Sequence, residues 1–335
     1  MRLSATVFWA GLMTIALSGS VSVQAQSNTI GGPMLGFVTD PAGSTIWPII
    51  GIPGASISGD RLEFDTAFRG AVISPKNDYA IAVRSEDAQV IIIDLAAAMP
   101  GVRSIGGLQP GADVLAISPA GSSAAAYDDE SKTVHTVGWL PYAPAVIGSL
   151  DVSGIPGRAA SIAVSDDGTV LLLKAIDDNG TALWVADSSG ALWRVAADRP
   201  SAAAFLPNSH NAVVTDEEAR SAFLLMDLDQ AGTQVPVISA EDGVGAFSSA
   251  VASPDGLRIY LASADSGVIT IVDRATWGHT QVSCGCRPTG FYQLKGTSIF
   301  RLNGPSSEPM TALEGSDGVA RIRIIPPHVS MTGQQ

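Results

Sequence analysis

The sequence predicts an all-β protein, a β-propeller of four-stranded antiparallel blades. Three observations predict it. The chain of 335 residues is 46% hydrophobic and only 15% charged, which is the composition of a folded protein. A turn motif recurs at intervals of forty-odd residues, and the apolar runs between its copies are short and lack a 3.6-residue period. Four short strands per repeat of this length are typical of propeller blades, whereas a β-sandwich has no reason to repeat one turn at this spacing.

Residues 1–25 have the parts of a secretory signal peptide in the expected order. Arg2 precedes the apolar run 6–17, which is too short to span a bilayer, and Ala25 provides a small-residue cleavage site. Ser20 lies where a bacterial lipoprotein has its lipidated Cys, so we expect no lipid anchor. The mature protein should therefore start near Gln26 and be exported to the periplasm or the exterior, with no membrane anchor after cleavage.

The segment after the signal peptide contains two apolar runs, Met34 to Thr39 and Thr45 to Ile50, joined by a Pro-Gly turn. They resemble the third and fourth strands of a repeat whose first half would fall inside the signal peptide. Dividing the 310 residues that remain (335 minus 25) by an interval near 44 gives seven. We therefore favour seven blades with one reduced, and the alternative is six blades plus an N-terminal hairpin. The hairpin should dock against the last repeat, near Phe300, Leu302, Ile322 and Ile324.

The recurring turn is clearest in the copy that begins at Ser253, where Pro254 presets φ and Gly256 accepts a left-handed conformation. The six copies start at Ser74, Ser118, Ser165, Leu206, Ser253 and Leu294, separated by 44, 47, 41, 47 and 41 positions. A residue that closes a third strand follows each start after 20 to 22 positions. The residues that define these turns are Ser74, Pro75, Ser118, Pro119, Ser165, Gly168, Pro207, Ser253, Pro254, Asp255 and Gly256.

Residues 253–276 resemble the YVTN-type β-propeller repeat, with Tyr260-Leu261-Ala262-Ser263 at the place of Tyr-Val-Thr-Asn. The turn also resembles those of WD-repeat propellers. As a repeat pattern the resemblance covers most of residues 69–327, and it implies a propeller without implying a chemistry, because such families include surface-layer proteins, sugar-lactone hydrolases and haem-binding propellers. We expect one propeller domain over 26–327 and a disordered C-terminal tail over 328–335.

The two cysteines form the motif Cys284-Gly285-Cys286. In a regular strand their Cα atoms would be about 6.6 Å apart, near the outer limit for a disulfide, and Gly285 can bend the backbone and shorten this span. An oxidising compartment favours a disulfide over two free thiols. The third alternative, a metal site, would need ligands that the neighbouring sequence does not supply beyond His279.

The charge of the chain argues against binding to nucleic acid. The 32 acidic residues outnumber the 19 basic ones, and loss of the signal peptide with Arg2 leaves 18 against 32, a net charge of −14. No cluster of Lys and Arg of the kind that holds a phosphate backbone occurs in the chain. We interpret the acidity as a source of solubility.

Motifs of known catalytic or cofactor sites are missing from the sequence, and we predict no cofactor and no metal site. The four His residues share no ligand spacing, and the acid-rich turns around residues 128–130, 166–167, 177–178 and 216–218 have the residues that turns select. The leading hypothesis is a monomeric, exported, non-enzymatic binding or interaction scaffold for an unidentified protein or small ligand. The alternative is a lactonase-like hydrolase with a metal in the central channel.

Overall fold

The computed structural model describes residues 32–97, 100–230, 232–295, 298–304, 309–315 and 319–327. The expected signal peptide, 1–25, and the expected C-terminal tail, 328–335, lie outside these residues. Within them the secondary structure is β-strand apart from one short 3₁₀ helix, η1 (Ala240–Asp242), between blades 5 and 6.

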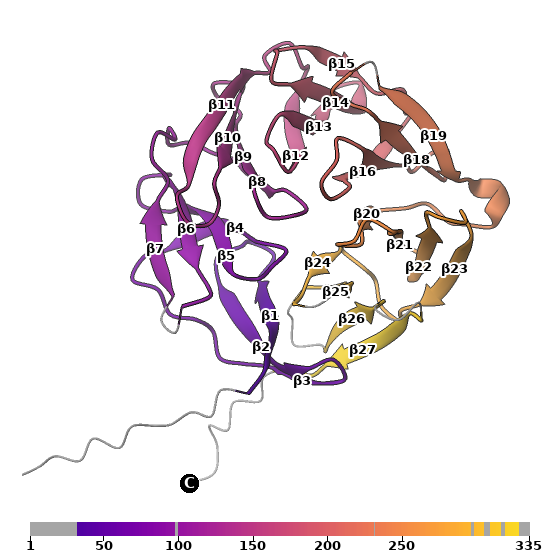
Figure 1. Ribbon diagram of the computed structural model, residues 1–335, viewed down its shortest axis with the longest axis horizontal. Coiled ribbons are helices and arrows are strands. Elements are labelled where there is room, and N and C mark those ends of the chain that lie inside the picture. The colour runs from indigo at the N-terminus through magenta and orange to yellow at the C-terminus, as the bar shows by residue number, and fades with distance from the viewer. Residues whose placement is uncertain are drawn as a thin grey trace, which may run out of the picture. The chain divides into compact units, whose positions relative to one another are not determined.

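The strands form seven antiparallel sheets, which are arranged as blades around a common axis (Figure 1). Among the described residues blade 1 has three strands and each of the other six has four. Blade 1 contains β1 (Met34–Thr39), β2 (Ile46–Ile52) and β3 (Ala55–Ser58); blade 2 contains β4 (Phe68–Ile73), β5 (Tyr79–Arg84), β6 (Val90–Asp94) and β7 (Gly101–Ser104); blade 3 contains β8 (Val114–Ile117), β9 (Ala124–Asp128), β10 (Thr133–Gly138) and β11 (Ala145–Asp151). Blade 4 contains β12 (Arg158–Val164), β13 (Val170–Asp177), β14 (Gly180–Asp187) and β15 (Leu192–Arg194); blade 5 contains β16 (Pro200–Phe205), β17 (Ala212–Asp216), β18 (Ser221–Met226) and β19 (Thr233–Ile238); blade 6 contains β20 (Ser249–Ala252), β21 (Arg258–Ser263), β22 (Val268–Asp273) and β23 (His279–Ser283); blade 7 contains β24 (Tyr292–Gln293), β25 (Ile299–Arg301), β26 (Met310–Glu314) and β27 (Arg321–Ile325).

The prediction of a seven-bladed propeller with one reduced blade is confirmed, and the alternative of six blades plus a hairpin is wrong. The placement of the hairpin within its blade differs from the prediction. Phe37 and Thr39 of β1 line the central cavity, so β1 and β2 are the inner strands of blade 1 and not its outer ones. The outer strand is β3, which the apolar pattern did not reveal because it has only four residues.

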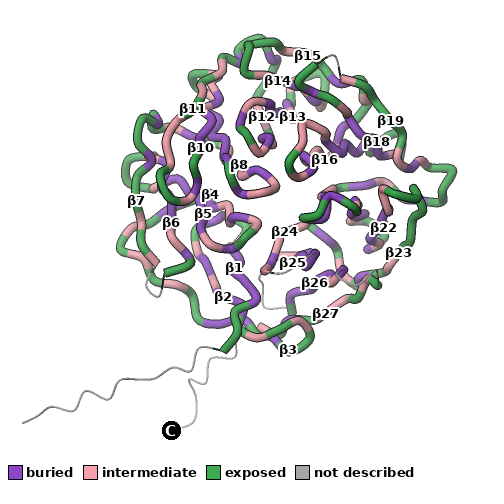
Figure 2. Tube along the Cα trace, viewed as in Figure 1, coloured by how far each residue is buried: buried purple, intermediate pink, exposed green. Residues whose placement is uncertain are grey.

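In the part of the chain that the structure describes, the hydrophobic core consists of seven clusters, and each cluster lies between two neighbouring blades. Side chains on the middle strands alternate between the two neighbours: Tyr79 and Ile81 of β5 pack toward blade 3, whereas Ala80 and Ala82 pack toward blade 1. Both faces of each middle strand are therefore buried, while outer strands such as β7 and β23 are mostly exposed (Figure 2). This pattern explains why the middle strands read as continuous apolar runs.

Blade 1 closes the ring by packing on blade 7. Leu35, Val38 and Ile49 form one buried cluster with residues of the last repeat, namely Leu294, Ile299, Met310, Ala312 and Ile325. The hairpin thus docks on the last repeat as expected, but through other residues than expected. Phe300, Leu302 and Ile322 face blade 6, and Ile324 is exposed. An assignment that is wrong by one position places a side chain on the opposite face of a strand.

Asn77, in the turn between β4 and β5, links three blades at this closing seam. Its side-chain oxygen accepts a hydrogen bond from the N–H of Phe37 in blade 1 (2.8 Å), and its Nδ2 donates to the carbonyl of Gln293 in blade 7 (3.0 Å). Asn77 is fully buried and has a φ of 56°, a left-handed conformation that Asn tolerates better than most residues. A side-chain amide, with its donor and its acceptor on one group, suits this position because it satisfies both backbone groups.

Candidate functional site

Six turns of one shape meet at one end of the ring axis. In each, the N–H of the first residue donates to the carbonyl of the residue five positions later, from Ser74 to Tyr79 through Leu294 to Ile299. The sequence-derived turn residues lie in these turns, including the degenerate copies at Leu206 and Leu294. Pro75, Pro119, Pro207 and Pro254 from four of the turns line the mouth of the central cavity. The repeated motif therefore builds the rim of the channel.

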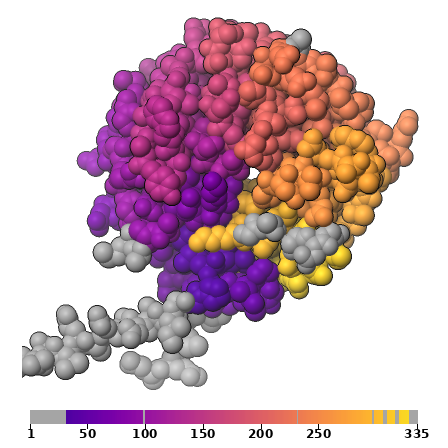
Figure 3. Space-filling model, in the orientation of Figure 1, coloured from indigo at the N-terminus to yellow at the C-terminus, as the bar shows by residue number. Residues whose placement is uncertain are grey.

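The central cavity has a volume of about 310 Å³, within the range of small-molecule pockets. Figure 3 shows a narrow opening at the centre of the ring. Aliphatic and aromatic side chains from the inner strands dominate the wall, and the ones that project from different blades include Phe37, Val72, Ile117, Val164, Phe205, Val251 and Phe291. Among the described residues that line the cavity, Arg301 carries the one charged side chain.

Arg301 lies at the end of β25 and is only 3% exposed. Its guanidinium stacks on the ring of Tyr292, with Cζ 4.0 Å from the ring centre, and its Nη1 donates to the carbonyl of Asn303 (2.9 Å). Its buried Nε finds no acceptor and no carboxylate pairs with it among the residues that the structure describes. Burial lowers the pKa of Arg301 to about 10, so the side chain is still a cation at neutral pH.

The mouth above this cavity has a volume of about 550 Å³ and also carries positive charge. Lys76 and Lys295 line it together with Asn208 and Gln293, and no acidic residue occurs among its described lining residues. Asp166 lies nearby, but both of its carboxylate oxygens accept backbone hydrogen bonds, from Ala120 N–H (2.7 Å) and Asn208 N–H (2.6 Å). The mouth of the channel is cationic in a protein with a net charge of −13.

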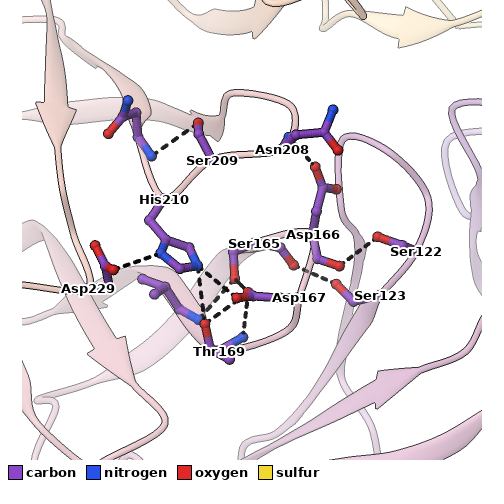
Figure 4. A network of polar contacts seen from close by, with 12 residues as sticks. Ser122, Ser123, Ser165, Asp166, Asp167, Thr169, Asn208, Ser209, His210 and Asp229 are labelled. Atoms are coloured by element: carbon purple, nitrogen blue, oxygen red, sulfur yellow. Dashed lines mark hydrogen bonds and ion pairs between the residues drawn. The ribbon is translucent and has the colours of Figure 1, made fainter.

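A polar network connects the turns of blades 3, 4 and 5 (Figure 4). His210 Nε2 lies 2.8 Å from Asp167 Oδ2, and its Nδ1 lies 3.3 Å from Asp229 Oδ2. Burial acts to lower the pKa of His210, but the hydrogen bonds and charges of Asp167 and Asp229 outweigh it and raise this pKa. Burial likewise acts to raise the pKa of Asp167, and hydrogen bonds from Ser165, Thr169 and His210 outweigh it and lower this pKa.

This network contains a hydroxyl, a carboxylate and an imidazole but is not arranged for nucleophilic catalysis. The hydroxyls of Ser165 and Thr169 both donate to Asp167, at 2.6 and 2.9 Å, so the carboxylate holds their protons, although Thr169 Oγ1 also lies 3.3 Å from His210 Nε2. Asp166, at the position where four of the other copies have Pro, joins the turns of blades 3 and 5 by accepting hydrogen bonds from Ala120 N–H and Asn208 N–H. The network thus holds neighbouring turns together.

Cys284 and Cys286 are joined by a disulfide, with their Cα atoms 5.1 Å apart. Gly285 between them has a φ of 60°, which bends the chain and brings the Cα atoms closer than in a regular strand. The pair follows β23 at the outer edge of blade 6, and neither residue lines the central cavity. Its position indicates a local constraint on the chain and no contact with the channel.

The other candidate residues from the sequence remain dispersed. Within the described part of the chain no three His, Cys, Asp or Glu side chains are arranged to hold a metal ion. His135 lies on β10 and His279 on β23, while His328 lies outside the described residues. The acids in the turns at 128 and 216 accept backbone hydrogen bonds from residues of their own turns. No described helix is long and apolar enough to cross a membrane.

The sequence interpretation missed the residues that make the channel distinctive. Arg301, Tyr292, Lys76 and Lys295 match no motif. Arg301 is 225 positions and Lys295 is 219 positions from Lys76 in the sequence, but the ring brings all three to the cavity or its mouth. One signal in the sequence could have found the two lysines, namely their position within the repeated turn. If six equivalent turns meet at the axis, the residues just after the start of each turn line the mouth together. Lys76 and Lys295 both occupy such positions.

Comparisons with known proteins support the architecture alone. No protein-family model matches the chain, and no curated protein matches it either. Among solved structures, a functionally unknown protein from Desulfotomaculum acetoxidans is similar with a TM-score of 0.57 and 15% identity, over 88% of this chain and 100% of that one. Hydrazine synthase of Kuenenia stuttgartiensis is similar with a TM-score of 0.51 and 12% identity, over 91% of this chain and 99% of that one. At these identities the similarity shows a common fold and no common function.

Proposed function

We propose that the protein is an exported, non-catalytic binding protein that takes an apolar ligand into its central channel. The observation that carries the proposal is the cavity of about 310 Å³ on the ring axis, whose wall is mainly aliphatic and aromatic. A cavity with such a wall gains free energy when apolar surface of a ligand replaces water in it. The turn motif supports this function indirectly, because its proline residues form the rim.

The alternative, a lactonase-like hydrolase, requires acidic side chains that converge on a metal in the channel. The described residues of the cavity wall include no Asp, Glu, His or Cys. The wall therefore favours binding over hydrolysis. The polar network around His210 supports the turns, and none of Ser165, Thr169 and His210 lines the cavity.

Isothermal titration of the full mature chain with 1-octanol tests binding in the channel. Ala204, on the cavity wall, provides the variant: Ala204→Phe fills the space and should abolish binding. Ala275, in an exposed turn of blade 6, provides the matched control, and Ala275→Phe should bind as the wild type does. Absence of binding by the wild-type protein, or unchanged binding by Ala204→Phe, would overturn the proposal.

Export is part of the proposal and rests on the order of charge, apolar run and small-residue exit in residues 1–25. We expect the protein to be recovered from the periplasm or the medium with an N-terminus near Gln26, as measured by mass spectrometry of the intact protein. A chain that retains Met1 and fractionates with the cytoplasm would contradict export and would leave the binding proposal to its own test.

A further inference from the structure

We propose that the ligand of the channel is an anion with an apolar chain, and that Arg301 binds its carboxylate. This inference rests on the proposed function, which it deepens by naming the chemical class of the ligand. It does not follow from the apolar wall alone, since that wall would accept a neutral molecule equally well. It follows from three features of the charged groups in the cavity and at its mouth.

The first feature is the incomplete pairing of Arg301. Arg301 is only 3% exposed, yet among the described residues it has no carboxylate partner and its Nε has no acceptor. A buried cation without a counter-ion is costly, and proteins almost always pair such groups. The protein provides an acceptor for Nη1 but none for Nε, so hydrogen-bonding capacity of the guanidinium remains for a ligand.

The second feature is the geometry of the free half. The ring of Tyr292 covers one face of the guanidinium at 4.0 Å, and Nη1 is used by the carbonyl of Asn303. Nε is buried without a hydrogen-bond partner, and Nη2 beside it makes no hydrogen bond to a described residue. Two parallel N–H groups on one edge match the two oxygens of a carboxylate in a bidentate pair. The stacked ring fixes the plane of this edge without occupying it.

The third feature is the sign of the charge along the route into the cavity. Lys76 and Lys295 line the mouth, and neither forms an ion pair with a described residue. The chain as a whole carries 32 acidic against 19 basic residues, so this concentration of cations runs against its composition. Cations in a concave site raise the local concentration of anions and increase the rate of their association. Mouth and cavity share Pro75, Pro119, Pro207, Pro254 and Gln293 and therefore adjoin.

Octanoate and 1-octanol form a matched pair of probes, because they have the same chain length and differ in the charge of the head group. We expect the wild-type protein to bind octanoate about 10- to 100-fold more tightly than octanol, the difference that a charge-assisted hydrogen-bonded pair produces. Arg301→Met, which keeps the length of the side chain and removes the charge, should eliminate this preference while octanol still binds. Arg301→Gln serves as the second variant, and Arg287→Met, at an exposed arginine outside the cavity, serves as the control that should retain the preference.

The outcomes separate the two proposals. Equal affinities for octanoate and octanol in the wild type, or a preference for octanoate that survives in both Arg301 variants, would overturn the inference and leave the channel as a site for neutral apolar ligands. Failure of the wild type to bind octanol would overturn the proposed function itself, whereas binding of octanol without binding of octanoate would overturn only the inference. The wild-type comparison needs no variant, so it decides the inference even where a substitution at Arg301 prevents folding.

Discussion

The two sides of the channel mouth differ in whether their charged side chains have partners. On the side of blades 3, 4 and 5, Asp166, Asp167 and His210 hydrogen-bond to partners in neighbouring turns. On the side of blades 7, 1 and 2, Asn77 joins the blades, while Lys76 and Lys295 lie at the mouth without ion pairs to described residues and Arg301 is buried behind them. The matched groups stabilise the ring. The unmatched cations mark the side that we assign to a ligand.

The largest effect is expected from removing the strands that close the ring on the second side. Deleting residues 26–58 removes blade 1 and exposes the packed faces of blades 2 and 7, where Leu35, Phe37, Val38, Ile46 and Ile49 are buried. At about 2 kcal/mol for each side chain, the loss is on the order of 10 kcal/mol, and the exposed strand edges should promote oligomers. Thermal unfolding measures the loss of stability, and size-exclusion chromatography measures the formation of oligomers. A variant that lacks only 26–31 is the control, and a monomeric 26–58 deletion with unchanged stability would show that blade 1 is dispensable.

Asn77 should have the next largest effect. Asn77→Ala removes the side-chain hydrogen bonds to Phe37 and Gln293, and leaves a residue that tolerates a φ of 56° poorly. We expect a loss of about 2 to 3 kcal/mol, measured by urea denaturation. Asn77→Gly, which keeps the backbone conformation and loses only the hydrogen bonds, should lose less than Asn77→Ala. Identical stability of Asn77→Ala and the wild type would show that the apolar contacts alone close the ring.

On the first side, the network around His210 should make stability depend on pH. The pKa of His210 is raised above its ordinary 6.5, so its contribution is fully present below pH 6.5 and is lost as pH rises through the raised pKa. The pKa of Asp167 is lowered below 3.8, so its contribution is present above that value and is lost as pH falls through the lowered pKa. We expect His210→Gln to cost about 1 kcal/mol at pH 6 and progressively less toward alkaline pH.

Denaturant titrations of the wild type and His210→Gln between pH 5 and 9 measure this dependence, with His279→Gln, at an exposed position, as the control. A stability difference that stays constant over this range would mean that the imidazole acts by packing and not by its charge.

The smallest effect is expected at the outer edge of blade 6. The disulfide between Cys284 and Cys286 closes a loop so short that its removal should cost about 1 to 2 kcal/mol, and the double Ser variant should stay folded. Intact mass without reductant, measured on protein exported under aerobic conditions, tests the bond itself. A mass that corresponds to two free thiols would contradict it.

The parts of the molecule that depend on local pattern could be predicted from the sequence, and the parts that depend on proximity could not. The turns at Ser74 or Ser253 are encoded by consecutive residues, so their period gave the blades and their number. The seam of blades 7 and 1 was expected at Phe300 but lies at Ile299, because a strand buried on both faces gives no sign of which face meets which neighbour. Arg301 and Lys76 are far apart in the chain, and only the closed ring brings them to one channel.

The unfolding free energy of Arg301→Met tests most directly the claim that Arg301 serves to bind a ligand, whereas the His210 network serves to stabilise the ring. If Arg301 is held for a ligand, replacing a buried unpaired cation by an apolar side chain of similar length should leave the ligand-free protein as stable as the wild type or more stable. If Arg301 instead supports the fold as the His210 network does, the substitution should destabilise the protein, by about 3 to 5 kcal/mol for a broken buried pair. Denaturant unfolding of the wild type and Arg301→Met without added ligand gives the answer: equal or greater stability is predicted, and a loss of that size would contradict the account.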